Sequence, residues 1–456
     1  MKQAARYGLS RAWLLGVWDR VRASFWFVPS LMVLGTGAFS YATVALDRRL
    51  GPEALESAGW MWSGGADGAR SVLSTIAGST ATVTGVVFSV NIVALTLASS
   101  QFGPRLLRNF TRDMGNQLVL GTFISTFLYA LLVLRVIRST DEGAFVPQIS
   151  VTCAVLLAVV SVGLLIYFIG HVAEAIQVES LIAAVGEELQ QEIVRRYSEG
   201  PARDAGAPGA ELPPEADMPR GTPLAVRAGT GGYVQSIALD ELADAAADFG
   251  AVIRVLFRPG DFVLTGEALA LVHGAARAPD EDDVARVRRA FSLGQRRTPT
   301  QDVNYGARQL TEIAVRALSP GINDPATAMG CMDWLGAALA ELARRTPEAP
   351  GHHKDGALRV LTRPVGFAEL AEAAFGPIRT YGAADPAVAV HLIRTLTRVG
   401  GAGGEADRTI LLRLAEQTAE DAARQTENEA DRGRIADALT RARAALGPDG
   451  VAPGPG

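Results

Sequence analysis

Six polar residues in the second half of the chain have types and spacing that could bind a ligand. They are Asp302, Tyr305, Arg308, Glu312, Asn323 and Asp324. Carboxylate and amide oxygens are ligands that a divalent cation prefers, and Arg308 can pair with Glu312 along a predicted helix over 299–318. We therefore consider a site for a divalent metal or a small polar ligand. The alternative is a helical hairpin with a solvated face, in which Asp324 caps a second helix over 325–344.

A second group of polar residues interrupts the apolar stretch 71–99. Its members are Thr75, Ser79, Thr82, Ser89, Asn91 and Thr96. Four of them recur every seven residues and would form one stripe along a helix. Several copies of such a helix around an axis would line a narrow polar pathway, which makes these six residues candidate pore-lining residues. Alternatively, small and hydroxylated residues let neighbouring helices pack closely, without any pathway.

Three arginines follow this stretch in the segment SQFGPRLLRNFTRD. Arg105, Arg108 and Arg112 would lie on one face of an interfacial helix that starts near Pro104. They could anchor the chain to anionic lipid headgroups. They could equally form a ring of positive charge at the cytoplasmic mouth of a pore, which would favour anions.

The sequence offers little for enzymatic chemistry. Lys2 and Lys354 are the only lysines, and neither lies in a phosphate-binding loop or an apolar pocket. The two cysteines, Cys153 and Cys331, indicate neither a disulfide framework nor a zinc site. No Ser/His/Asp or Cys/His arrangement is visible, and the loop around 352–353 holds histidines that we expect to be exposed. We therefore nominate no catalytic residue and no cofactor, and an enzyme is the least favoured class.

Charge separates the chain into two parts. Residues 1–170 contain 13 Lys and Arg against 8 Asp and Glu, whereas residues 171–456 contain 30 against 40. An acidic soluble part without a basic cluster cannot neutralise a phosphate backbone, so we exclude nucleic acid as a partner.

Four apolar stretches are long enough to cross a bilayer as helices. They are residues 25–46, 71–99, 117–137 and 149–170. Eight Lys and Arg flank them on the side of the N-terminus, against five on the other side. Because positive charge favours the cytoplasm, both termini are predicted to be cytoplasmic, in the cell inner (plasma) membrane.

The rest of the chain is predicted to be soluble. Helical spacing continues over 171–198 as an extension of the fourth span, and 199–221 is rich in Pro and Gly and resembles a linker. Short β-type runs over 222–275 predict a small β-barrel or sandwich, with one helix at 239–248. Residues 276–446 predict an α-helical domain, and 447–456 a disordered tail. The expected fold class is a multi-domain membrane protein with a four-helix transmembrane domain and a cytoplasmic α+β region.

Three segments of this sequence resemble a family of predicted bacterial inner-membrane proteins, the domain of unknown function number twenty-two fifty-four. They are TATVTGVVFSVNIVALTLASSQFGPRLLRNFTRD, NQLVLGTFISTFLYALLVLR and RALSPGINDPATA. The resemblance covers nearly the whole chain and implies a membrane architecture. It implies no activity and no site residues.

Two hypotheses about function follow. The first is a homo-oligomeric channel or transport-like protein whose second span faces the symmetry axis and whose cytoplasmic region senses or gates, because polar side chains are costly against lipid. The second is a membrane-anchored receptor or scaffold without a pore, whose cytoplasmic domain binds a small ligand or a protein partner. The bilayer is a partner in both.

Overall fold

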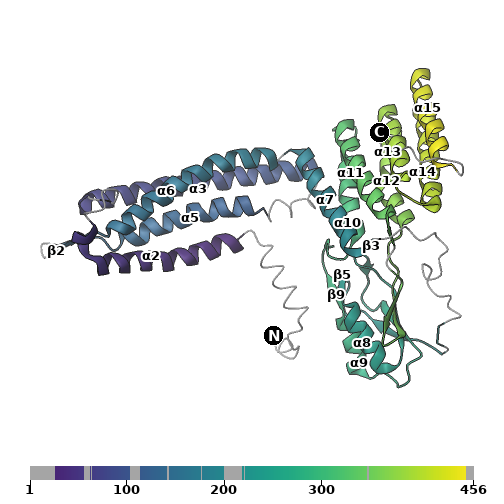
Figure 1. The fold of residues 1–456 in the computed structure, drawn as a ribbon, viewed down its shortest axis with the longest axis horizontal. Coiled ribbons are helices and arrows are strands. Elements are labelled where there is room, and N and C mark those ends of the chain that lie inside the picture. The colour runs from purple at the N-terminus through teal and green to yellow at the C-terminus, as the bar shows by residue number, and fades with distance from the viewer. Residues whose placement is uncertain are drawn as a thin grey trace. The chain divides into compact units, whose positions relative to one another are not determined.

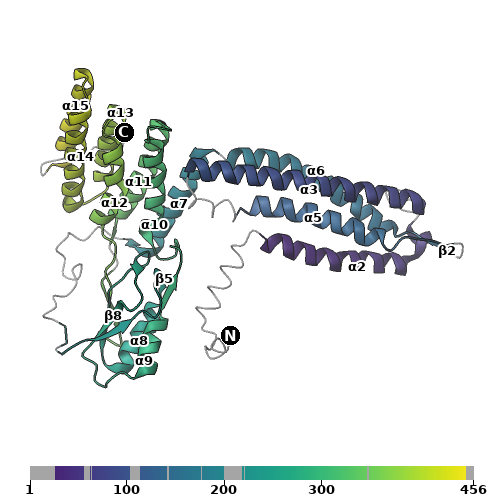
Figure 2. The same ribbon diagram turned by 180° about the vertical axis from the view of Figure 1, so that it is seen from behind.

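The structure is a computed structural model that divides into two compact units, Met1–Ser180 and Leu181–Gly456. It describes residues 26–55, 62, 64–102, 113–140, 143–175, 177–199, 218–219, 221–346 and 349–447. Figure 1 shows the long helices of the first unit and the mixed α/β second unit, and Figure 2 shows both from behind.

The first unit is a bundle of four long helices. They are α2 (Phe27–Leu55), α3 (Ala66–Phe102), α5 (Met114–Leu134) and α6 (Gln148–Ala175). Each contains a stretch long and apolar enough to cross a membrane, which confirms the four predicted apolar helices. The short antiparallel hairpin of β1 (Arg138–Thr140) and β2 (Gly143–Phe145) connects α5 to α6.

Helix α5 lies at the centre of this bundle. It packs against α2, α3 and α6, and it is the most buried of the four spans. Glycine makes one of these contacts close, because a Cβ at Gly121 would meet the sulfur of Met32 and the backbone of Pro29 in α2. The other three helices each turn an apolar face outward, as expected of helices that contact lipid.

The described residues of the second unit form two larger β-sheets and one pair of very short strands. The larger sheet has the order β11-β12-β6-β8-β4, and the smaller has the order β7-β5-β9. The strands are β4 (Leu224–Arg227), β5 (Gly232–Ile237), β6 (Val252–Val255), β7 (Phe262–Val263), β8 (Ala268–His273), β9 (Phe291–Gly294), β11 (Gly351–Lys354) and β12 (Ala357–Leu361). Neither sheet closes on itself. The region is therefore mixed α/β, and the predicted barrel or sandwich is not confirmed.

Two helices cover the apolar side of these strands. Helix α8 (Leu239–Phe249) buries Leu242 and Phe249 against Ile253 and Leu269, and it matches the predicted helix 239–248. Helix α9 (Glu281–Arg289) follows, with a capping box at its N-terminus.

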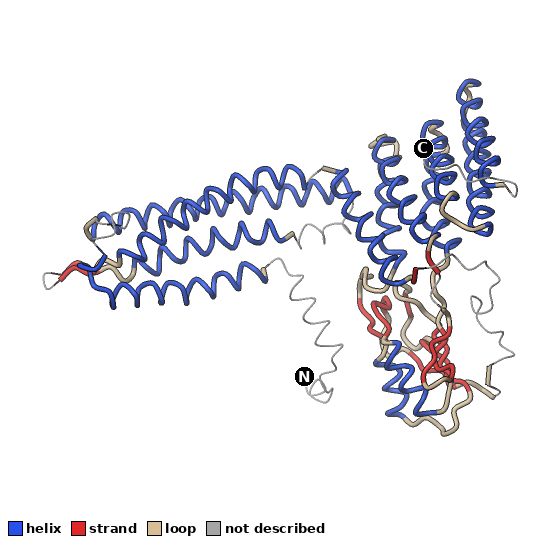
Figure 3. Tube along the Cα trace, in the orientation of Figure 1, coloured by secondary structure: helices blue, strands red, loops and turns tan. Residues whose placement is uncertain are grey.

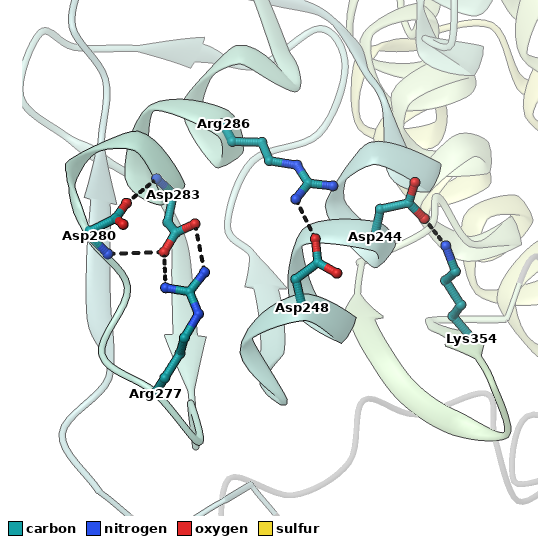
Figure 4. A network of polar contacts seen from close by, with 7 residues as sticks. All are labelled: Asp244, Asp248, Arg277, Asp280, Asp283, Arg286 and Lys354. Carbon is teal, nitrogen blue, oxygen red and sulfur yellow. Dashed lines mark hydrogen bonds and ion pairs between the residues drawn. The ribbon is translucent and has the colours of Figure 1, made fainter.

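Ion pairs on the surface join α8 to its neighbours, as Figure 4 shows. Arg286 of α9 donates to Asp248 of α8 at 2.5 Å, and Lys354 of β11 donates to Asp244 of α8. These groups are exposed, so solvent screens the pairs and they contribute little to stability.

Three strands of the two larger sheets lie outside the predicted β-rich segment 222–275. Strands β9, β11 and β12 come from 291–294 and 351–361, within the region that the sequence predicted to be an α-helical domain. His352 and His353, expected in an exposed loop, belong to β11. His353 is exposed, whereas His352 is half-buried and lies 3.2 Å from the Thr362 hydroxyl. Strand β12 pairs in parallel with β6, bringing Val360 opposite Ile253, so distant segments complete the sheet.

The remainder of the second unit is helical, as Figure 3 shows in blue. Its helices are α7 (Val178–Arg196), α10 (Val303–Ala317), α11 (Pro325–Ala343), α12 (Phe367–Gly382), α13 (Pro386–Gly400), α14 (Glu405–Gln425) and α15 (Glu429–Leu446). Short strands β3 (Ser198–Glu199) and β10 (Arg345–Thr346) pair between α7 and α11. The hairpin of α10 and α11 agrees with the predicted helices 299–318 and 325–344. Helix α7 is separate from α6, whereas the sequence predicted one continuous helix.

Candidate functional site

The face of α3 that a single chain leaves exposed is rich in small polar residues. Thr75, Ser79, Thr82, Ser89 and Thr96 are all exposed, and so they lie on the surface of the four-helix bundle. Gly78 and Gly85 lie on the same face, because 78, 82, 85 and 89 follow the helical spacing i, i+4, i+7 and i+11. A Cβ at either glycine would meet nothing within 4 Å. Val86 and Val93 are exposed on the same side of the helix. The exposed hydroxyls and glycines among residues 75–96 are hereafter the polar face of α3.

The threonines of the polar face bond to their own helix. Thr75 donates to the carbonyl of Ser71 at 2.8 Å, Thr82 to that of Gly78 at 3.0 Å, and Thr96 to that of Ile92 at 2.8 Å. Such bonds reduce the cost of holding a hydroxyl in an apolar medium. Within the described residues, the hydroxyls of Ser79 and Ser89 have no such bond. The polar face therefore keeps hydrogen-bonding capacity for water, an ion or another helix.

Asn91 lies on the opposite face of α3. It is only 8% exposed, and Val87 and Ala94, one turn before and after it, belong to a cluster of buried apolar residues. Neither its amide nitrogen nor its amide oxygen has a partner among the described residues. The structure therefore separates Asn91 from the other five candidate pore-lining residues.

Buried hydroxyls run along α5 on the inside of the bundle. Thr126 lies 3.1 Å from the Ser161 hydroxyl of α6, and Tyr129 lies 2.9 Å from the Thr43 hydroxyl of α2. All four residues are less than a tenth exposed. These bonds join α5 to α2 and α6, two of its three neighbours, in a medium where an unpaired hydroxyl is costly.

Asp47 near the end of α2 caps α6. Its carboxylate accepts hydrogen bonds from the backbone of Ile149 at 2.8 Å and of Ser150 at 3.0 Å, and from the Ser150 hydroxyl at 2.6 Å. The carboxylate is buried, and it satisfies N–H groups that the first turn of a helix leaves unpaired. Local sequence patterns do not reveal this role, because the two partners are about a hundred residues apart.

At the other end of the bundle, Asp113 joins α5 to α6. It accepts from the backbone of Gly115 at 2.8 Å as the N-cap of α5, and its Oδ2 lies 2.5 Å from Nε2 of His171. Tyr167 stacks on the His171 ring. His171 is thus part of a polar contact between helix ends. The candidate headgroup or pore-mouth residues Arg105, Arg108 and Arg112 lie outside the described residues.

In the second unit, Asp302 is buried against an arginine. The carboxylate is 4% exposed, and its Oδ2 accepts from Nη2 of Arg297 at 2.7 Å and from Nε at 3.1 Å. Burial raises the pKa of Asp302, although the Arg297 charge lowers it in part. Gly260 makes room for this pair, since a Cβ there would overlap both side chains, and its φ of +94° also favours glycine. Asp302 is therefore a structural ion-pair partner in this structure.

A second ion pair connects the turn at 258–261, which contains Gly260, to α12. Arg258 donates twice to Glu369, at 2.8 and 2.6 Å, and its backbone N–H bonds to Asp261 at 2.8 Å. The Arg258 guanidinium lowers the pKa of Glu369. The Arg-Pro-Gly-Asp turn at 258–261 thus joins the β-sheets to the helices.

We expect Glu369→Gln to change how the stability of the second unit depends on pH. A depressed pKa means that Glu369 stabilises the fold above the pKa that it has in the unfolded chain, about 4.3, and that this stabilisation is lost as the pH falls through the folded value. The variant should lower the unfolding temperature at pH 7 by about 1–3 °C and weaken the decline below about pH 4. Scanning calorimetry of the full chain checks this. If the unfolding temperatures of the original chain and of Glu369→Gln fall equally below about pH 4, the role of the ion pair is contradicted.

The other predicted ligand residues lie at the far end of α10. Asp324 caps α11 by accepting from the Thr327 backbone at 3.1 Å and the Thr327 hydroxyl at 2.6 Å, and these bonds lower its pKa. Asn323 is exposed and adopts a φ of +50° in the turn. Since α10 has 15 residues, about 22 Å separates its ends, so one ion cannot bind both Asp302 and Asp324.

The three remaining candidates lie along α10. Tyr305 and Glu312 are half-buried and Arg308 is exposed. Within the described residues, no group of three or more His, Cys, Asp or Glu side chains could hold a metal ion. The structure therefore does not bring the six candidate ligand residues together.

Comparison with known proteins agrees with the apolar helices. The family described as "Predicted membrane protein (DUF2254)" matches residues 22–398. The chain is also 33% identical over 388 residues to an uncharacterized protein of Mycobacterium tuberculosis and to one of Mycobacterium bovis, which covers 84% of this chain and 73% of each relative. No solved structure matches significantly. The resemblance seen in the sequence is thus confirmed, and the chain belongs to the DUF2254 family of predicted membrane proteins.

Proposed function

We propose that this membrane protein assembles as a homo-oligomeric channel or transport-like protein, with α3 of each copy facing a shared axis. One observation carries the proposal. The polar face of α3 is exposed in a single chain, although it lies in the middle of a helix that is long and apolar enough to span a bilayer. A single chain in a membrane would hold these hydroxyls against lipid.

Comparison with α6 supports this reasoning. The exposed face of α6 is aliphatic, with Val159, Val162 and Ile166 each more than half exposed, as expected of a surface in contact with lipid. On α3 the exposed surface also carries hydroxyls and glycines, beside apolar residues such as Val86 and Val93, which are 56% and 65% exposed. Small residues allow close approach of helices, and free hydroxyls can contact water or ions.

The second unit supplies the sensing or gating region in this proposal. Both termini are then cytoplasmic and the membrane is the cell inner membrane, because more Lys and Arg flank the spans on the side of the N-terminus. Reporter fusions that are active only on one side of the membrane test the orientation. A C-terminal reporter active outside the cytoplasm would overturn it.

Reconstitution of the purified full chain into planar bilayers tests the transport activity. Ion current or flux under a gradient, a voltage or membrane tension is expected. If assembled protein carries no current under any of these conditions, the pore is excluded. The close packing of α3 would then serve a membrane-anchored receptor or scaffold.

A further inference from the structure

A pocket of about 300 Å³ lies among α11, α13 and α15 in the second unit. Helix α13 packs against both of the other helices. The pocket is lined by His391 and Arg394 of α13 and by Arg434, Asp437 and Arg441 of α15, with Met329 and Val390 as its apolar part. This volume is at the small end of the range for small-molecule sites.

The pocket is positively charged in an acidic part of the chain. Three arginines and one aspartate line it, so these four side chains carry a net charge of about +2. Residues 171–456 as a whole contain 30 Lys and Arg against 40 Asp and Glu. The positive charge is therefore local and does not reflect the overall composition.

Two of the three guanidinium groups are available to a ligand. Arg434 bonds to Asp431, one turn earlier on α15. Within the described residues, Arg394 and Arg441 have neither an ion pair nor a side-chain hydrogen bond. His391 also lines the pocket, and its Nε2 lies 3.0 Å from a carboxylate oxygen of Asp333. Two unpaired guanidinium groups from facing helices thus border one cavity.

We propose that this pocket binds a small organic phosphate, with its phosphate groups between Arg394 and Arg441 and its apolar part on Met329 and Val390. Guanidinium groups bind phosphate oxygens with two parallel hydrogen bonds, which makes arginine the preferred residue for multiply charged oxyanions. Met329 and Val390 would contact the nucleobase or a similar apolar group of the ligand. This inference does not depend on the channel proposal, because binding is measured without a membrane current.

Isothermal titration calorimetry of the full chain in nanodiscs at low salt tests the proposal. The probes are inorganic pyrophosphate and magnesium-free ATP. We expect saturable binding of one molecule per chain, with ATP tighter than pyrophosphate. Arg394→Gln and Arg441→Gln should each weaken ATP binding at least about tenfold. Asp437→Asn should tighten it, because the substitution removes a negative charge from the pocket, and a gain of affinity cannot come from misfolding.

Arg413→Gln is the matched control. Arg413 is exposed on α14 and does not line the pocket, so its substitution removes the same charge elsewhere on the helical part. It should leave ATP binding nearly unchanged. The proposal is overturned by the absence of saturable binding at millimolar probe, by equal affinity for the two probes, or by an equal loss in Arg413→Gln.

Discussion

Gly85→Leu should dissociate the assembled protein into single chains and abolish its ion current. Gly85 lies in the polar face of α3, between Thr82 and Ser89, and a larger side chain there would hold neighbouring copies of α3 apart. We expect the protein concentration needed for assembly to rise by at least about tenfold. Native mass spectrometry from detergent measures the assembly, and planar bilayers measure the current.

Gly163→Leu on α6 is the matched control for this substitution. Gly163 is also exposed, and a Cβ there would meet nothing within 4 Å, as at Gly85. In a single chain, both leucines would simply contact lipid. If the two variants assemble and conduct alike, the polar face of α3 is not an interface between copies.

Arg297→Ala should strongly destabilise the second unit. The substitution leaves the Asp302 carboxylate, which is 4% exposed, without its counter-charge. Removing one partner of a buried ion pair costs about 3–5 kcal/mol. Urea unfolding of the full chain in nanodiscs, followed by hydrogen exchange in α10, measures the loss.

The loss should also depend on pH in a defined direction. Burial already raises the pKa of Asp302, and removal of Arg297 should raise it further. A raised pKa stabilises the fold below the unfolded value and loses that stabilisation as the pH rises through the folded value. Arg297→Ala should therefore be less destabilised at pH 5 than at pH 8. The neighbouring Arg296, which is exposed and has no ion pair within the described residues, is the control; an equal effect of Arg296→Ala would refute the role of the pair.

The four apolar helices could be predicted from the sequence because their signal is local. Gln148–Ala173 is apolar over more than the thickness of a bilayer, whatever the rest of the chain does. The same holds for the hairpin of α10 and α11, whose turn contains Gly321 and Asn323 and is followed by Pro325 at the start of α11. Capping and turn residues act within a few positions of where they stand, so a pattern reveals them.

Two strands of the larger sheet, β11 and β12, could not be predicted from local sequence patterns. Strand β11 reads Gly-His-His-Lys, with no alternation of apolar and polar residues, and β12 pairs with β6 about a hundred residues earlier. The roles of Asp47 and Asp302 could not be predicted either, because both depend on residues that are distant in the sequence. Asp47 caps a helix from far along the chain, and the depth at which Asp302 is buried depends on the distant turn at Gly260.

The candidate pore-lining residues also could be predicted only in part from local spacing. Thr75, Ser79, Thr82, Ser89 and Thr96 share an exposed face, as the seven-residue repeat predicted for most of them. Asn91 is two positions from Ser89, about 200° around the helix, and is therefore buried against the bundle. Helical spacing identifies which residues share a face, but only the packing of α3 shows which face is covered.

Cysteine crosslinking at Ser89 tests the association of α3 helices around an axis most directly. Replacing Cys153 and Cys331, the two free cysteines, by serine gives a background free of thiols. In that background, Ser89→Cys should form disulfide-linked pairs of chains under mild oxidation in native membranes, whereas Val162→Cys on the exposed face of α6 should not. Linked pairs through Val162→Cys but not through Ser89→Cys, or no pairs from either, would contradict the arrangement.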